Sequence, residues 1–208
     1  NAIGTVTGKA GSLALKNTGD ITLGKAGNPT AATPVPAEGL TIKAGATTVE
    51  STSGDIKVAG DGVTATGAGS LALTTSTGKS VTLEQDAKIQ GTGTNALDLK
   101  VKTGTLDLAS GTKIDATGGA IDLAVDHVTL PGTETDLIAS AGGEIKIDTA
   151  TTGHAIGIGA AAPASGDLSL DRLDFIAAGA KKISIGSKNT GAVTIGNTTA
   201  SSSSPSPN

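Results

Sequence analysis

The chain has 208 residues, a net charge of −4 and no Cys, Met, Trp or Tyr, and its single Phe is Phe175. Large aromatic side chains dominate ordinary globular cores, so this composition excludes a broad core of the usual kind. No long basic run and no stretch of about 18 apolar residues occurs, which argues against nucleic-acid partners and against membrane insertion.

Short segments that alternate aliphatic and polar residues follow one another along the chain. Each places aliphatic residues two positions apart, the pattern of a strand with one buried and one solvated face. None shows a sustained helical period. Single aliphatic residues between the segments add further strand signals. The predicted strands are 12–15, 20–23, 40–44, 55–59, 70–74, 80–84, 96–101, 105–109, 120–125, 127–130, 144–148, 155–159, 167–170, 182–186 and 192–196, with single signals at Val49, Val63, Ile89, Ile114 and Leu137.

The strand signals recur roughly every 7–10 residues, a spacing that fits a β-sandwich, a β-barrel or a β-solenoid. In a parallel β-helix, aliphatic side chains fill a narrow interior by stacking on like residues in the next coil, which accounts for the missing aromatics. Three strands with their bends, roughly 22–28 residues, close one coil. We therefore predict an all-β parallel β-helix of about seven coils with three short strands each, forming one domain over residues 1–197.

Two segments break this rhythm. Residues 24–39 contain three of the seven prolines, and because proline cannot donate to a strand ladder they are predicted to form a projecting loop. Residues 198–208 are rich in Ser and Pro and are predicted to form a disordered tail or linker. The loop is a candidate contact surface for a partner, through Asn28, Pro29, Pro34, Pro36 and Glu38.

One phrase occurs twice, as "KNTGDITLG" at residues 16–24 and as "KNTGAVTIG" at residues 188–196. We expect the Thr-Gly pair to turn a corner, the two aliphatic residues to face the interior and the Thr between them to face water. Apart from two exchanges of one aliphatic residue for another, the copies differ at Asp20 against Ala192, which indicates a position that needs no particular chemistry.

The residues capable of catalysis or metal binding are few. His127 and His154 lack the spacing of a metal-binding motif and are interpreted as turn or surface residues. The carboxylates of Asp115, Asp122 and Asp126 could align on adjacent coils as a polysaccharide-cleaving or calcium site, but their alternation with aliphatic residues is typical of a solvated strand face. We predict no catalytic, cofactor or metal site.

A weak N-glycosylation pattern, "NTT", begins at Asn197.

Residues 142–196 resemble filamentous-haemagglutinin-like exoproteins of the two-partner secretion type. The segments that carry the resemblance are "EIKIDTA" (144–150), "GHAIGIG" (153–159), "LSLDRLDFIAAGAKKISIG" (168–186) and "NTGAVTIG" (189–196). They match the order and approximate spacing of the family's repeats, although "AAGAKKISIG" carries extra residues. The family's amino-terminal secretion domain has no counterpart here. The resemblance implies a right-handed β-helix from the shaft of a secreted or surface-displayed bacterial adhesin.

The expected function is therefore that of a non-enzymatic extracellular structural or adhesive protein. Its expected partners are carbohydrate or protein receptors on a host or neighbouring cell, and the chain reads as a mature product or a fragment of a longer protein. Two alternatives remain open. The chain could polymerise end to end through open coil ends, or, more remotely, act on polysaccharides as a β-helix enzyme.

Overall fold

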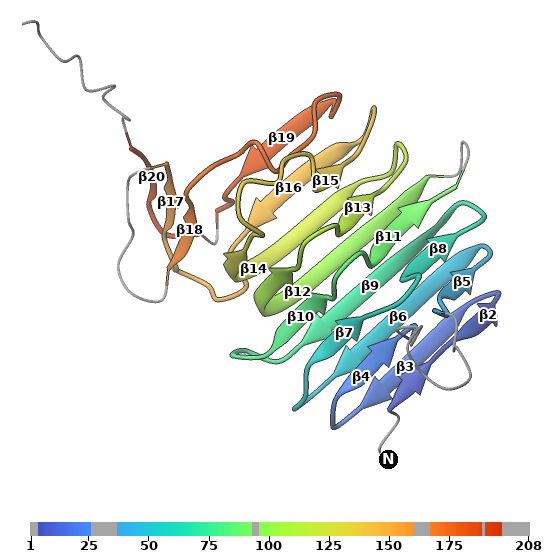
Figure 1. The fold of residues 1–208 in the computed structure, drawn as a ribbon. Coiled ribbons are helices and arrows are strands. Elements are labelled where there is room, and N and C mark those ends of the chain that lie inside the picture. Colours follow the sequence, from blue (N-terminus) through green and yellow to red (C-terminus); the bar gives the residue numbers. More distant parts are fainter. Residues whose placement is uncertain (1–3, 26–36, 93–95, 160–166, 189, 197–208) are drawn as a thin grey trace, which may run out of the picture.

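The computed structural model describes residues 4–25, 37–92, 96–159, 167–188 and 190–196. All regular structure in these residues is β-strand, and the pairings between named strands are all parallel. Within this part of the chain there is no helix long and apolar enough to cross a bilayer. The strands stack one above another from β2, β3 and β4 to β19 (Figure 1).

The strands group into three ladders of parallel neighbours, which we number for reference. Ladder 1 comprises β3 (Leu13–Asn17), β6 (Gly45–Ser51), β9 (Gly69–Thr75), the first part of β12 (Leu97–Leu108), the first part of β14 (Ile121–Thr129), β16 (Glu144–Asp148) and β19 (Lys182–Ile185). Ladder 2 comprises β1 (Thr5–Val6), β4 (Ile21–Leu23), β7 (Ile56–Val58), β10 (Ser80–Leu83) and the second parts of β12 and β14. Ladder 3 comprises β2 (Gly8–Ala10), β5 (Leu40–Ile42), β8 (Val63–Ala65), β11 (Lys88–Gly91), β13 (Lys113–Asp115) and β15 (Ile138–Ala139).

From β1 to β16 the chain visits these ladders repeatedly in the same order: ladder 2, then ladder 3, then ladder 1. Paired positions lie 25 residues apart where Ile56 pairs with Val81 and Val81 pairs with Leu106. The step is longer, at 35 residues, where Ile21 pairs with Ile56, because the segment around 24–39 intervenes. The all-β, parallel prediction is confirmed, and the arrangement is compatible with a β-solenoid.

Aliphatic side chains fill the space between the ladders, as the alternation predicts. Ile56 and Val58 are fully buried while Lys57 between them is exposed. The same holds at Ile145 and Ile147, which are buried on either side of the half-exposed Lys146. Each such side chain stacks on the equivalent aliphatic residue of the next strand, which keeps the core narrow and continuous.

Two predicted strand pairs are single strands in the structure. The segments predicted at 96–101 and 105–109 are both parts of β12, and those predicted at 120–125 and 127–130 are both parts of β14. Because β12 and β14 run through the bend between ladders 1 and 2, these two ladders form one 11-stranded sheet.

The carboxyl-terminal part departs from the regular order. β17 (Ile156–Ile158), β18 (Leu168–Leu170) and β20 (Val193–Ile195) form a separate three-stranded sheet in which β17 lies in the middle. In Figure 1 this sheet stands apart from the stacked ladders, beside the end of β14.

The second copy of the repeated phrase behaves differently from the first. Ile21 and Leu23 of β4 are fully buried between β1 and β7, as expected. Val193 and Ile195 of β20 are 44% and 75% exposed, so the prediction that both pairs face the interior is wrong for this copy. The physical reason is that β20 pairs with β17 on one side only, within the described residues.

The interpretation of Asp20 as chemically neutral is also wrong. Its Oδ1 accepts a hydrogen bond from the backbone N–H of Asp55 at 2.9 Å. In the next step of the ladder, Asp55 Oδ1 accepts one from the N–H of Ser80 at 2.8 Å. Aspartate after the corner glycine therefore binds an N–H at the first residue of the paired strand or at the residue just before it.

We expect Asp55→Ala to lower the free energy of unfolding by about 1–2 kcal/mol, because the Ser80 N–H loses a charged acceptor. Asp107→Ala removes a carboxylate from the outer side of ladder 2 and serves as the matched control. Urea unfolding followed by circular dichroism measures both variants. Equal effects of the two substitutions would contradict a specific role for the Asp55 hydrogen bond.

Candidate functional site

The corner between ladders 1 and 2 carries a column of buried polar side chains. Asn17, Ser51 and Thr75 occupy successive paired positions, and Thr103 follows them, its hydroxyl 2.7 Å from that of Thr75. All four are buried. They bind backbone carbonyls of the turns, for example Ser51 Oγ to the Gly19 carbonyl at 2.8 Å. Neutral hydroxyl and amide groups therefore satisfy this corner in the first four strands of ladder 1.

In β14, the next strand of ladder 1, a charged residue enters this corner. Thr103 pairs with Val125 and Thr105 pairs with His127, so Asp126 takes the place of Gly104 at the corner. The Asp126 side chain is 7% exposed. Its Oδ1 accepts the backbone N–H of Thr151 at 2.9 Å, and its Oδ2 accepts the hydroxyl of Thr151 at 2.7 Å. These two bonds join the corner to the segment that follows β16.

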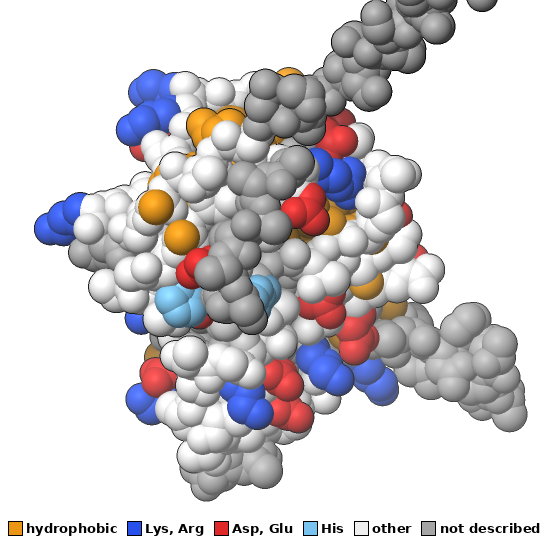
Figure 2. Space-filling model, turned by 90° about the vertical axis from the view of Figure 1, so that its left-hand side faces the viewer, with side chains coloured by type: hydrophobic (Ala, Val, Ile, Leu, Met, Phe, Trp, Pro, Cys, Tyr) orange, Lys and Arg blue, Asp and Glu red, His pale blue; other side chains and the backbone are white. Residues whose placement is uncertain are grey.

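His154 faces the same carboxylate. Its Nδ1 lies 3.6 Å from Asp126 Oδ1 and is buried without a hydrogen-bond partner among the described residues. His127, the other histidine of the chain, is exposed beside it. Figure 2 shows the imidazoles, in pale blue, on one face of the molecule.

Both histidines line one cleft of about 290 Å³, which we call the histidine cleft. It adjoins a hollow of about 160 Å³ that includes Lys102. The remaining lining of the histidine cleft is hydroxyl groups, backbone and one carboxylate, contributed by Thr77, Gly78, Gly104, Thr105, Asp126 and Thr151. The hydroxyl nearest the carboxylate, that of Thr151, already donates to Asp126. The cleft thus offers two imidazoles and several hydroxyl groups, while most of its exposed surface belongs to carbon atoms.

The three carboxylates that the sequence analysis considered together do not converge. Asp115 lies on ladder 3, where its Oδ1 accepts the N–H of Thr117 at 2.9 Å. Asp122 lies on ladder 1, with Oδ1 3.8 Å from Lys146 Nζ. Asp126 alone reaches the corner, and in the described residues no three His, Asp or Glu side chains are placed to hold a metal ion.

The predicted contact loop is described only at its base. Glu38 is exposed, and its backbone forms an antiparallel bridge to Lys25, with N–O distances of 2.7 and 2.9 Å. Asn28, Pro29, Pro34 and Pro36 lie outside the described residues, as does Asn197.

Sequence reasoning treated each histidine separately and missed their common cleft. A signal was present: the Thr-Gly of the corner formula in "KTGT" becomes Val-Asp in "AVDH", so an acid and a histidine enter a corner that is otherwise neutral. The position of His154 could not be predicted, because it depends on the path of residues 149–155 after β16 ends.

A second buried carboxylate, Asp148, lies near this corner at the end of β16. Burial raises its pKa, but hydrogen bonds from Ser187, Thr190 and the Thr149 backbone, with the charge of Lys146, outweigh burial and hold the pKa below its ordinary value. The Thr149 N–H lies 2.9 Å from Oδ1 and Lys146 Nζ lies 3.4 Å from Oδ2.

Because the folded-state pKa of Asp148 is depressed, its contribution to stability is present above the unfolded value of about 3.9 and is lost as pH falls through the folded value. Asp148→Asn should therefore destabilise the chain at neutral pH and lose less stability than the parent chain on acidification. Urea unfolding between neutral and acidic pH measures this difference, with Asp122→Asn as control. A constant gap between parent and Asp148→Asn at all pH values would contradict the linkage.

Comparison with known proteins found no match to this chain among family models, curated proteins or solved structures.

Proposed function

We propose that the chain is a segment of the shaft of a secreted or surface-displayed bacterial adhesin. In this proposal it folds as a right-handed parallel β-helix of about seven coils with three short strands each, over residues 1–197. The observation that carries the proposal is the repeated return of the chain to the same three ladders in the same order, around an aliphatic interior.

This arrangement suits a rigid spacer. Each added strand pairs its backbone with the strand before it and stacks its aliphatic side chains on those already in place, so length is gained without widening the core. Outward residues such as Thr22, Lys57 and Thr82 share one column yet differ in chemistry. The outer surface is thus free to vary while the interior pattern stays constant.

The adhesive part of the proposal concerns the clefts and loops on the outside. The histidine cleft offers imidazole, hydroxyl and carboxylate groups to a carbohydrate or protein receptor. Contacts of this size are weak singly, and an adhesin gains strength from many of them acting together.

Two measurements test this proposal. Negative-stain images of the purified chain should show short rods. Globular particles would contradict the proposal that the chain forms a shaft. The chain displayed in many copies on beads should bind host or bacterial cells, with lower retention for a His127→Ala/His154→Ala variant. Equal retention of beads that carry the parent chain and beads that carry the variant, or retention no greater than that of bare beads, would contradict the adhesive role. Neither result would contradict the rod-like fold.

We propose no catalytic activity for this chain. We expect no release of reducing ends from common polysaccharides above the blank, either by the parent chain or by Asp126→Ala and Asp122→Ala variants. Release by the parent chain that one of these substitutions abolishes would support the polysaccharide-acting enzyme instead.

A second candidate function, end-to-end association, is favoured by a separate observation. Ile183 of β19 is 47% exposed although its ladder partner Ile145 is buried, and Ile195 of β20 is 75% exposed beside its half-buried partner Ile158. Sedimentation velocity tests this: association that Ile183→Asp and Ile195→Asp weaken would support it. A monomer at all accessible concentrations would exclude it for this chain.

A further inference from the structure

Ladder 2 is interrupted beyond β14. The next strand beside it, β18, pairs with β17 and with no other strand of the described residues, so β14 and β18 adjoin without a backbone ladder. The interruption uncovers part of the interior. Val128 is half-buried although its ladder partner Leu106 is fully buried, and Leu130, two residues further along, is also half-buried.

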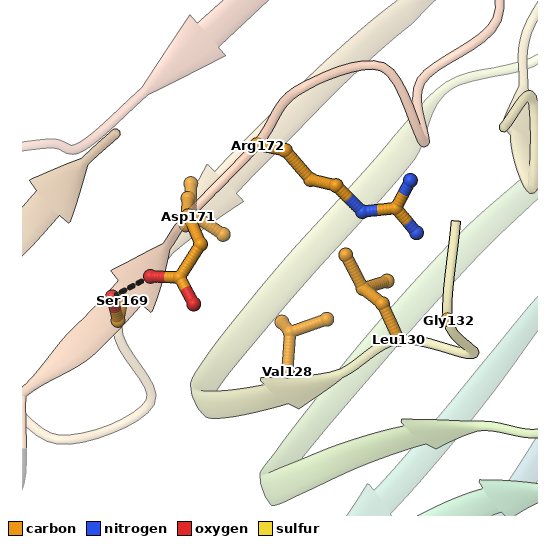
Figure 3. A pocket seen from close by; sticks show the side chains of 7 residues that line it. Val128, Leu130, Gly132, Ser169, Asp171 and Arg172 are labelled. Carbon is orange, nitrogen blue, oxygen red and sulfur yellow. Dashed lines mark hydrogen bonds between the residues drawn. The ribbon is translucent and has the colours of Figure 1, made fainter. Parts of the chain in front are cut away.

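These two side chains contribute to a cleft of about 310 Å³ between β14 and β18, which we call the aliphatic cleft (Figure 3). Its other side carries Ser169, Asp171 and Arg172 from β18 and the turn after it. In Figure 3 the Asp171 carboxylate and the Arg172 guanidinium both lie on the side of β18 that faces Val128 and Leu130. The two aliphatic side chains form the floor, and most of the remaining surface of the cleft is polar or charged.

The charge of Arg172 is already engaged. Its Nη1 lies 3.1 Å from Asp174 Oδ1, and its Nη2 donates to the backbone carbonyl of Pro131 at 3.5 Å. The guanidinium thus links the turn after β18 to the segment after β14 across the cleft.

The Asp171 carboxylate can still accept hydrogen bonds from a ligand. It is exposed and its Oδ1 accepts one hydrogen bond, from Ser169 Oγ at 2.7 Å. Among the described residues its carboxylate forms no ion pair. An ionised carboxylate accepts several hydrogen bonds, so Asp171 can receive a donor from a ligand.

From this combination we propose that the aliphatic cleft binds an aliphatic ammonium group. The methylene chain of the ligand lies on Val128 and Leu130, and its ammonium donates to Asp171. A volume of about 310 Å³ is at the lower end of the range for ligand pockets and suits a small group of this kind. The group is a lysine side chain of a partner polypeptide or a free alkylamine, and the site is independent of the proposed adhesive role.

Titration of the full chain with three five-carbon probes tests the chemistry, with chemical shifts of backbone amides near Leu130 and Asp171 as the readout. We expect n-pentylammonium to bind in the millimolar range, pentan-1-ol more weakly because it lacks the charge, and pentanoate not at all because Asp171 repels it.

Variants locate the site. Asp171→Asn should weaken n-pentylammonium binding about tenfold, since a charged hydrogen bond is lost. Leu130→Thr should also weaken it, because the methylene chain of the probe loses aliphatic contact on the floor of the cleft. Glu144→Gln, an equal charge change on an exposed residue of ladder 1, should leave it unchanged. Thermal unfolding of each variant confirms that it is folded.

The two sources of the group are separated by a fourth probe, Nα-acetyl-lysine methylamide. Tighter binding of this probe than of n-pentylammonium indicates a lysine side chain whose backbone also contacts the edge of β18 that faces away from β17. Tighter binding of the simple amine indicates a free alkylamine. Equal shifts with the ammonium, alcohol and carboxylate probes, or no loss in Asp171→Asn, would overturn the proposal.

Discussion

Ile56→Asp is expected to unfold the chain at room temperature. The Ile56 side chain is fully buried between Ile21 and Val81, its partners on the two neighbouring strands, which are fully buried themselves. A carboxylate at this position would lie in an aliphatic interior without a hydrogen-bond donor, and burial of an unpaired charge is among the most destabilising single changes. We expect a loss of about 4 kcal/mol or more.

Lys57→Asp is the matched control, because Lys57 is the next residue on β7 and is exposed. We expect its stability to remain within about 0.5 kcal/mol of the parent chain. Circular dichroism during urea unfolding measures both variants. Equal tolerance of Asp at 56 and 57 would show that β7 does not place these residues on opposite faces.

Gly62→Ala is expected to have the next largest effect. Gly62 has a φ of 71°. A Cβ added at this residue would lie 1.9 Å from the Lys88 carbonyl oxygen and 2.6 Å from the Lys88 backbone nitrogen. Both of these Lys88 atoms belong to the backbone of β11, so the backbone of ladder 3 must shift to make room. We expect a loss of more than about 3 kcal/mol and weaker pairing between β8 and β11.

Gly78→Ala separates backbone strain from this collision. Gly78 has a similar φ of 77°, but a Cβ added there meets nothing within 4 Å. Its replacement should cost only the left-handed backbone conformation, about 1–2 kcal/mol. Hydrogen exchange of β8 and β11 amides provides the second readout. Losses of the same size for both glycines would mean that φ alone determines the effect.

The strand pattern could be predicted from the sequence because it depends on local alternation. Ile56, Lys57 and Val58 alternate in burial as expected, and so do the residues around Lys146. Parallel pairing followed from the spacing of these segments, since 25-residue steps bring equivalent positions together.

The irregular parts could not be predicted, because they depend on which strand finds a partner. The segment at 167–170 was expected as one more strand of the series, but it became β18 of a separate sheet beside β14. That single change of partner leaves Val128 half-exposed and creates the aliphatic cleft. Alternation predicts that a segment is a strand, not which edge it joins.

The role of Asp20 was missed for a related reason. Its acceptor function depends on the N–H of Asp55, which is 35 residues away and adjacent only after the ladders form. The histidine cleft likewise joins residues from β14 and from the segment after β16. Side chains at the corners acquire their roles from the neighbouring strand of the ladder, which local sequence does not specify.

Cysteine pairs test the central claim, that the chain returns to three parallel ladders in register, most directly. The chain contains no cysteine, and adjacent in-register strands place Cα atoms about 4.8 Å apart, within the range that a disulfide spans. One outward pair per ladder is suitable: Thr48 with Ala72, Thr82 with Asp107, and Thr41 with Thr64. Mass spectrometry after mild oxidation should find an intramolecular disulfide in each double-cysteine variant. A control pair two strands apart, at Lys57 and Asp107, should not form one. Absence of the disulfide in any ladder, or equal oxidation of the control pair, would contradict the three-ladder fold.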